Sequence, residues 1–127
     1  VEVLEVKHIV VCGHYGCGGV KAAMTRNSYG LINKWLRNIK DVYRFHEEEI
    51  AALPTEEERV NRLIELNIET QVLNLAETSI VQSAWKKHNR PHLHGWVYGL
   101  DDGLIKPLTM IEPNTPLPYP IYQYDNL

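Results

Sequence analysis

The chain lacks long apolar runs, is poor in cysteine and carries little net charge. Its 127 residues contain no stretch of about 18 apolar residues, so no membrane span is expected. Two cysteines, Cys12 and Cys17, are too few for a disulfide framework, and a reducing, cytoplasmic location is the simpler expectation. A formal charge of −3 gives no reason to expect nucleic acid as a partner.

The first residues also lack an initiator methionine and a helix cap. Val1–Val6 reads like the interior of a structural element rather than its beginning. No signal peptide is visible in these residues. We therefore expect the polypeptide to continue upstream.

A strand, a loop and a helix are predicted in the first quarter of the chain. His8–Cys12 is apolar and β-branched, which is typical of a buried parallel strand. Four glycines fall within residues 13–19, which predicts a tight loop. Val20–Met24 contains good helix formers and should follow as a helix.

Two long helical segments are predicted next. Leu31–Phe45 has the apolar stripe of an amphipathic helix. Thr55 and Glu58 have the spacing of a capping box, so another helix should begin there. Its apolar pattern lasts for about thirty residues, and because a single helix of that length is unusual we expect a bend or break near residues 67–70. Two tryptophans lie on the apolar stripes and are predicted to be core residues: Trp35 and Trp85.

A β-hairpin is predicted after the helices. His92–Tyr98 alternates between its two faces as a strand does. The turn signal at residues 101–103 and the residues from Leu104 onward predict a second strand, with Pro107 at its edge or exit.

The order of these elements predicts an α/β fold. We expect a partly parallel β-sheet with helical crossovers and a C-terminal hairpin strand, incomplete in this chain. Residues 1–107 would form the domain. Residues 108–127 form a proline-rich tail whose apolar side chains predict that it packs against the rest of the protein.

His14 and Cys17 are the first candidates for chemistry. They are three residues apart in the glycine-rich loop, at the strand end where α/β proteins place their sites. An imidazole nitrogen and a thiolate sulfur favour zinc over hard cations. Two ligands do not complete a tetrahedron, so a buried cysteine beside a loop histidine is the alternative interpretation.

Other readings of the same loop stay open. Cys12 is interpreted as a small buried residue of the strand, since a redox pair with Cys17 lacks the Cys-x-x-Cys spacing. The loop glycines could instead hold a phosphate on backbone N–H groups, although they match neither the P-loop nor the dinucleotide fingerprint.

The remaining histidines have weaker signals. His92 and His94 share a strand face with Trp96 and Tyr98, where a structural role is more usual than metal binding. Three others have no partner nearby in the sequence and are expected to have ordinary roles: His8, His46 and His88.

Several segments together resemble the β-class carbonic anhydrases, most of all the bacterial, enterobacterial-like branch. The loop resembles the second zinc motif of that family, a His-x-x-Cys preceded by glycine at a strand end. The resemblance covers roughly residues 1–108 and is carried by six segments in order: Ile9–Val20, Gly30–Leu36, Glu65–Asn67, Gln82–Trp85, His94–Gly99 and Asp102–Gly103.

The resemblance implies a zinc-dependent lyase that reversibly hydrates carbon dioxide to bicarbonate and a proton. It implies Zn²⁺ ligation by His14 and Cys17, and a substrate pocket shaped by Gly18 and Gly19. It further implies a homo-oligomer, a dimer or tetramer. In some members a tyrosine corresponding to Tyr98 helps to hold a regulatory bicarbonate ion.

One part of the family pattern has no counterpart in these residues. The family's Cys-x-Asp-x-Arg motif supplies a further zinc ligand and an Asp–Arg pair, and it is expected upstream or on another chain. The isolated 127-residue chain should therefore be inactive or nearly so. The alternative function is a truncated, non-catalytic binding or dimerisation module.

Overall fold

Three strands form one mixed sheet in the computed structural model, which describes all 127 residues. The strands are β1 (His8–His14), β2 (His92–Tyr98) and β3 (Ile105–Ile111), in the spatial order β1–β2–β3. Strands β1 and β2 are parallel, whereas β2 and β3 are antiparallel. The predicted α/β fold with a partly parallel sheet and a C-terminal hairpin strand is therefore confirmed.

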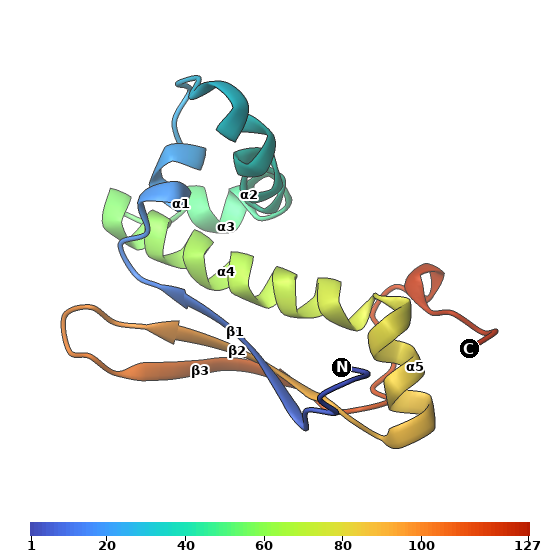
Figure 1. Cartoon of the computed structure of the whole chain (residues 1–127). Helices are drawn as coiled ribbons and strands as arrows, with labels where there is room; N and C mark the ends of the chain where they lie inside the picture. Colours follow the sequence, from blue (N-terminus) through green and yellow to red (C-terminus); the bar gives the residue numbers. More distant parts are fainter.

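All five α-helices lie between β1 and β2 in the sequence and so form the crossover that joins the parallel strands. They are α1 (Gly18–Ala23), α2 (Asn33–Phe45), α3 (Glu47–Ala51), α4 (Glu56–Ala76) and α5 (Ser79–His88), with short 3-10 helices at Gly30–Ile32 and Pro120–Tyr122. Helix α4 runs along one face of the sheet, with α1, α2 and α3 at one end of it and α5 at the other (Figure 1). None of the five combines the length and apolar character that a bilayer span requires.

Helix α4 starts as predicted but ends elsewhere. The Thr55 hydroxyl accepts from the Glu58 backbone N–H while the Glu58 carboxylate accepts from the Thr55 N–H, which is the predicted capping box. The helix then continues unbroken through residues 67–70, so the break predicted there is wrong. The break comes instead after Ala76, because the Thr78 hydroxyl accepts from Val81 N–H and caps a new helix, α5.

Two glycines let α4 approach the sheet closely. A Cβ atom on Gly95 would lie 2.9 Å from Thr109 Cγ2 and 3.0 Å from Ile68 Cγ2, and one on Gly13 would lie 2.6 Å from Ile68 Cδ1. A larger residue at either position would therefore require the Ile68 or Thr109 side chain to shift. This contact places the end of β1 firmly against α4.

The opposite face of the sheet carries no helix (Figure 1). Side chains of β1 that point to it are exposed, including Val10 at 40%. The prediction of a buried parallel strand is therefore right about the pairing of β1 with β2 but wrong about burial, because β1 lies at one edge of this sheet and is covered on one face only. The sequence did not show the alternation of exposed and partly buried positions along β1, because apolar residues occur on both of its faces.

The hydrophobic core lies between α4 and its neighbours. A larger cluster joins α4 to α1, α2, α3 and β2, and it contains Leu36, Ile50 and Leu63. A smaller cluster joins the end of α4 to α5 and β2 and contains Trp85, which is 3% exposed as predicted. Trp35, in contrast, is 56% exposed, so its assignment to the core is wrong: Leu36, Ile39 and Val42 fill the covered side of α2.

Strand β3 follows a turn with Gly103 in the left-handed conformation, as the turn signal predicted. Pro107 lies in this edge strand beside a bulge: Trp96 pairs with Pro107 and Gly95 with Thr109, which leaves Leu108 as the extra residue. The strand continues to Ile111, beyond the position where the proline-rich tail was expected to begin.

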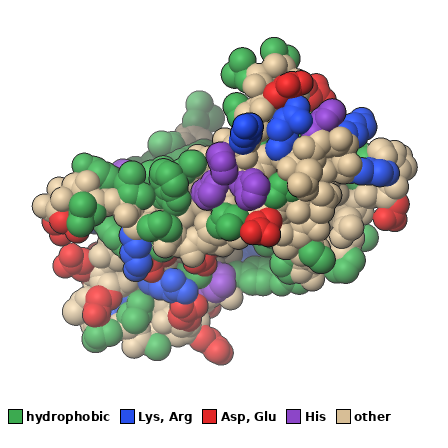
Figure 2. Space-filling model, turned by 90° about the horizontal axis from the view of Figure 1, so that it is seen from below, with side chains coloured by type: hydrophobic (Ala, Val, Ile, Leu, Met, Phe, Trp, Pro, Cys, Tyr) green, Lys and Arg blue, Asp and Glu red, His purple; other side chains and the backbone are tan.

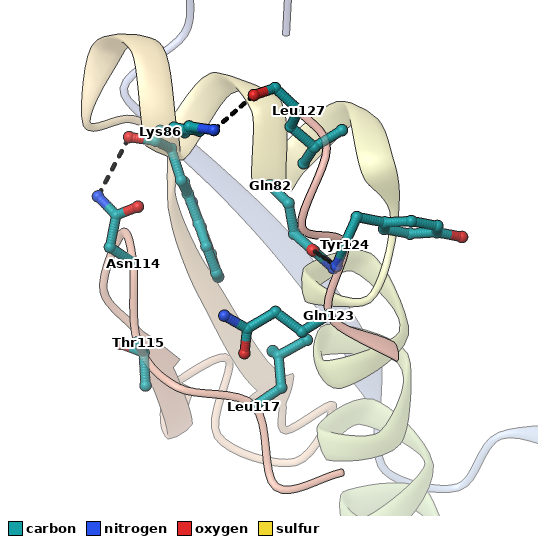
Figure 3. Close-up of a pocket in the computed structure, with 9 residues that line it drawn as sticks. Gln82, Lys86, Asn114, Thr115, Leu117, Gln123, Tyr124 and Leu127 are labelled. Carbon is teal, nitrogen blue, oxygen red and sulfur yellow. Dashed lines mark hydrogen bonds between the residues drawn. The ribbon is translucent and has the colours of Figure 1, made fainter. Parts of the chain in front are cut away.

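The C-terminal tail packs against α5 (Figure 3). Leu117 is 8% exposed within the smaller core cluster. The Gln82 amide donates to the Tyr122 carbonyl at 3.0 Å and accepts from Tyr124 N–H at 2.9 Å. Lys86 Nζ donates to the carbonyl oxygen of Leu127. The tail therefore covers α5 with almost no regular structure of its own.

Candidate metal centre

The two predicted ligands lie on either side of one tight turn. His14 is the last residue of β1, and Cys17 is the N-cap residue of α1. Gly16, between them, has φ +72°, a conformation that L side chains rarely adopt. Gly18 and Gly19 form the first turn of α1 rather than the end of the loop, so the helix begins two residues earlier than predicted.

The imidazole of His14 is oriented by its neighbour's backbone. His14 Nδ1 lies 2.9 Å from the Tyr15 carbonyl oxygen. A carbonyl can only accept, so Nδ1 carries the proton and Nε2 keeps its lone pair. This is the arrangement that metal-binding histidines adopt in proteins.

Tyr15 fixes the turn to the rest of the fold. Its backbone N–H donates to the Tyr98 carbonyl at 3.0 Å, and its hydroxyl donates to Glu65 Oε2 at 2.5 Å. Arg62 and Lys106 also contact the Glu65 carboxylate, at 3.2 Å and 3.5 Å. The turn is thus tied both to the end of β2 and to α4.

Burial, hydrogen bonds and charges in this network shift two pKa values. Burial, together with the bond to Glu65, raises the pKa of Tyr15 to about 12. Burial of Glu65 acts to raise its pKa, but the Tyr15 hydrogen bond and the nearby cations outweigh it and lower that pKa. The carboxylate therefore stays ionised and Tyr15 stays protonated around neutral pH.

The donor set of the turn fits part of a zinc site. Imidazole nitrogen and thiolate sulfur are both ligands that zinc prefers. No third His, Cys, Asp or Glu side chain of the chain converges with them on a common point. His14 and Cys17 therefore account for two ligands of a site that needs at least one more.

The predicted substrate glycines border different surroundings. A Cβ atom on Gly18 would meet nothing within 4 Å, so the space beside it is open. One on Gly19 would lie 3.1 Å from the Trp35 ring and 3.8 Å from Cys17 Sγ. The half-exposed Trp35 thus forms an apolar wall next to the turn.

Tyr98 lies at the end of β2 directly beside the turn. Its Cα is paired with that of His14, and its side chain is 36% exposed. A Cβ atom on Gly103 would lie 3.7 Å from the Tyr98 hydroxyl, so the ring lies toward the β2–β3 turn.

One prediction about another side chain is wrong. Cys12 is exposed on the uncovered face of the sheet, not buried in the strand. His8 has no partner nearby in the sequence, as stated, but lies 2.9 Å from the distant His94 through their ring nitrogens and packs near His92. Burial, followed by the charges of His8 and His92, lowers the pKa of His94.

The sequence interpretation missed Tyr15 and Glu65 as supports of the turn. Glu65 fell inside a segment that carried the family resemblance, but no role was assigned to it. A lone acid on a predicted helix gives no local signal, because its partner lies 50 residues away.

Comparisons with known proteins point to one family. A protein-family model described as carbonic anhydrase matches residues 1–105. A carbonic anhydrase of Emericella nidulans is 51% identical over 110 residues, which are 87% of this chain and 48% of that protein. The chain spans about half the length of the curated relatives it matches.

The solved structures that match the chain belong to the same family. The Coccomyxa β-carbonic anhydrase in complex with acetazolamide matches 87% of this chain and 51% of its own, with a TM-score of 0.82 and 34% identity. A tetrameric β-carbonic anhydrase of Sordaria macrospora matches 86% of this chain and 56% of its own, with a TM-score of 0.80 and 34% identity.

The predicted enterobacterial-like branch has no support in these comparisons. Carbonic anhydrase 1 of Escherichia coli O157:H7 is 29% identical over 109 residues, well below the fungal relative.

Proposed function

The chain belongs to the β-class carbonic anhydrase family, and on this basis we propose that it forms part of an enzyme that reversibly hydrates carbon dioxide to bicarbonate and a proton. The observation that carries the proposal is the turn at the end of β1, where His14 and Cys17 flank Gly16 within the matched residues.

In this proposal His14 Nε2 and Cys17 Sγ hold zinc. The Tyr15 carbonyl keeps the His14 ring in the required tautomer, and Glu65 keeps Tyr15 in place. When bound, zinc supplies a water molecule that ionises near neutral pH. Because the chain brings no third donor to the turn, the remaining ligand comes from outside these residues, and the 127 residues alone are inactive.

The same proposal gives this chain's residues the task of shaping the substrate pocket. Carbon dioxide is small and apolar, and it needs open space beside the metal ligands. Gly18 leaves such space, and the Trp35 ring beside Gly19 offers an apolar wall. A side chain at position 18 would fill the space and exclude the substrate.

Three further features belong to the proposal. The tetrameric Sordaria relative supports assembly as a homo-oligomer, a dimer or tetramer.

Tyr98 helps to hold a regulatory bicarbonate with groups from outside this chain; the alternative is that it only packs with Trp96. Neither cysteine forms a disulfide, in keeping with a cytoplasmic location.

The test is carbon dioxide hydration by the whole native protein, followed in a stopped-flow pH assay. We expect activity that chelation removes and Zn²⁺ restores, with none from the 127-residue chain alone. Full activity of the native protein after its metal has been removed would contradict the proposal.

The non-catalytic module has less support. The matched relatives carry the name of the enzyme, and this does not favour a remnant that only binds or dimerises. Native protein that folds and assembles but binds no zinc and hydrates no carbon dioxide would reverse this preference.

A further inference from the structure

Three histidines from two strands meet on the uncovered face of the sheet. His8 and His92 are Cα partners in the parallel pair β1–β2, and His94, the partner of Val10, lies two pairs further along. Leu93, between the two β2 histidines, is fully buried, so His92 and His94 point away from that buried side. Figure 2 shows histidine side chains gathered on this face of the molecule.

The three imidazole rings are in contact. His8 Nδ1 lies 2.9 Å from His94 Nε2. The ring centroid of His8 lies 5.2 Å from that of His92 and 5.1 Å from that of His94. The proposed zinc ligand His14 is six residues further along β1, at a distance of about 20 Å for an extended strand. The cluster is therefore separate from the turn.

These distances suit a shared metal ion. Two nitrogen atoms that each lie about 2.0–2.1 Å from one ion are roughly 2.9–3.4 Å apart, for angles between octahedral and tetrahedral. His8 Nδ1 and His94 Nε2 have that separation as a hydrogen-bonded pair, so an ion bound by both would replace the proton that they share. In the present rotamers no three donors converge on one point, so His92 must rotate its ring to complete the set. His92 is partly exposed at the first position of β2.

We propose that His8, His92 and His94 form a second metal site, for a divalent transition metal of the nickel, copper and zinc group. A set of three imidazoles without carboxylate is typical of ligands for these ions and is poor for magnesium or calcium. Bound there, the ion cross-links the first residues of β1 to β2, at the end of the sheet opposite the turn.

The experiment is a titration of the metal-free native protein with Ni²⁺, carried out in a Cys17→Ser background so that the turn does not compete. We expect one Ni²⁺ per chain in this background. His8→Gln and His94→Gln should each weaken binding at least tenfold. His88→Gln, at an exposed histidine of α5, is the matched control and should bind Ni²⁺ unchanged. A parallel titration with Zn²⁺ should show the same order of variants, and one with Mg²⁺ should show no binding.

Two outcomes overturn the site. The first is no Ni²⁺ binding up to about 1 mM free ion, which corresponds to only the weakest specific affinities. The second is binding that His8→Gln and His94→Gln leave unchanged. Since His8 is exposed, His8→Gln should fold normally, and it decides the question even if His94→Gln does not fold. Circular dichroism of each variant checks the fold.

Discussion

The hydrogen bond from Tyr15 to Glu65 should stabilise the turn that holds His14 and Cys17. Tyr15→Phe removes only the hydroxyl and leaves the ring in place. The Tyr15 backbone N–H still donates to Tyr98, so the turn keeps its path. The variant therefore isolates one bond, 2.5 Å long, to a carboxylate whose side chain is 14% exposed.

We expect Tyr15→Phe to lower the free energy of unfolding by about 1–2 kcal/mol. Hydrogen bonds to charged groups contribute about 1.5–3 kcal/mol. The lower range applies here because Tyr15 is only partly buried and Glu65 keeps its contacts with Arg62 and Lys106. Zinc affinity should fall by less than about tenfold. The His14 ring bonds to the Tyr15 carbonyl, whereas the Tyr15 hydroxyl bonds to Glu65, so its loss affects the zinc ligand only indirectly.

Urea unfolding of Tyr15→Phe, Glu65→Gln and the double variant measures this bond directly. The double-mutant cycle should give a coupling energy of about 1 kcal/mol at pH 7. Glu65 has a lowered pKa in the folded protein, so its contribution is present above its unfolded pKa and disappears as pH falls through the folded value. A coupling energy near zero at pH 7, or one that grows in acid, would refute this account.

Three other perturbations test the surrounding fold. Gly95→Ala should lower the free energy of unfolding by about 1–3 kcal/mol, because its Cβ would clash with Thr109 and Ile68; a stability equal to the parent's would mean that α4 does not pack closely on β2. Thr55→Ala should lower the unfolding free energy by about 1 kcal/mol through loss of the capping box, and an unchanged urea midpoint would contradict it. Tyr15, with its pKa raised to about 12, should add stability below about pH 10 that is lost as pH rises through 12; in alkaline unfolding Tyr15→Phe should lack this loss, and identical alkaline profiles would argue against the buried bond.

Local signals in the sequence predicted local structure well. The capping box at Thr55 and the hairpin turn before β3 depend on residues within a few positions of one another. The strand–turn–helix around His14 and Cys17 is also local. The helix break was placed too early because the apolar pattern runs without interruption past Thr78, whose capping role is a single weak signal.

Features that depend on distant residues could not be predicted. Periodicity shows that one side of a strand or helix is apolar, but not whether another element covers it, so Cys12 and Trp35 were wrongly expected to be buried. The contact of His8 with His94 joins residues 86 positions apart, and it arises only from the parallel pairing of β1 with β2.

Zinc analysis of the native protein carrying Cys17→Ser is the most direct test of the central claim. Cys12→Ser is its matched control, since Cys12 is the other cysteine of the chain and lies exposed on β1, five residues before Cys17. A serine hydroxyl is a far poorer zinc ligand than a thiolate, so Cys17→Ser should lose the zinc of the turn and the hydration activity, while Cys12→Ser keeps both. Zinc content and activity in Cys17→Ser equal to those of the parent protein would contradict the assignment of His14 and Cys17 as the metal ligands.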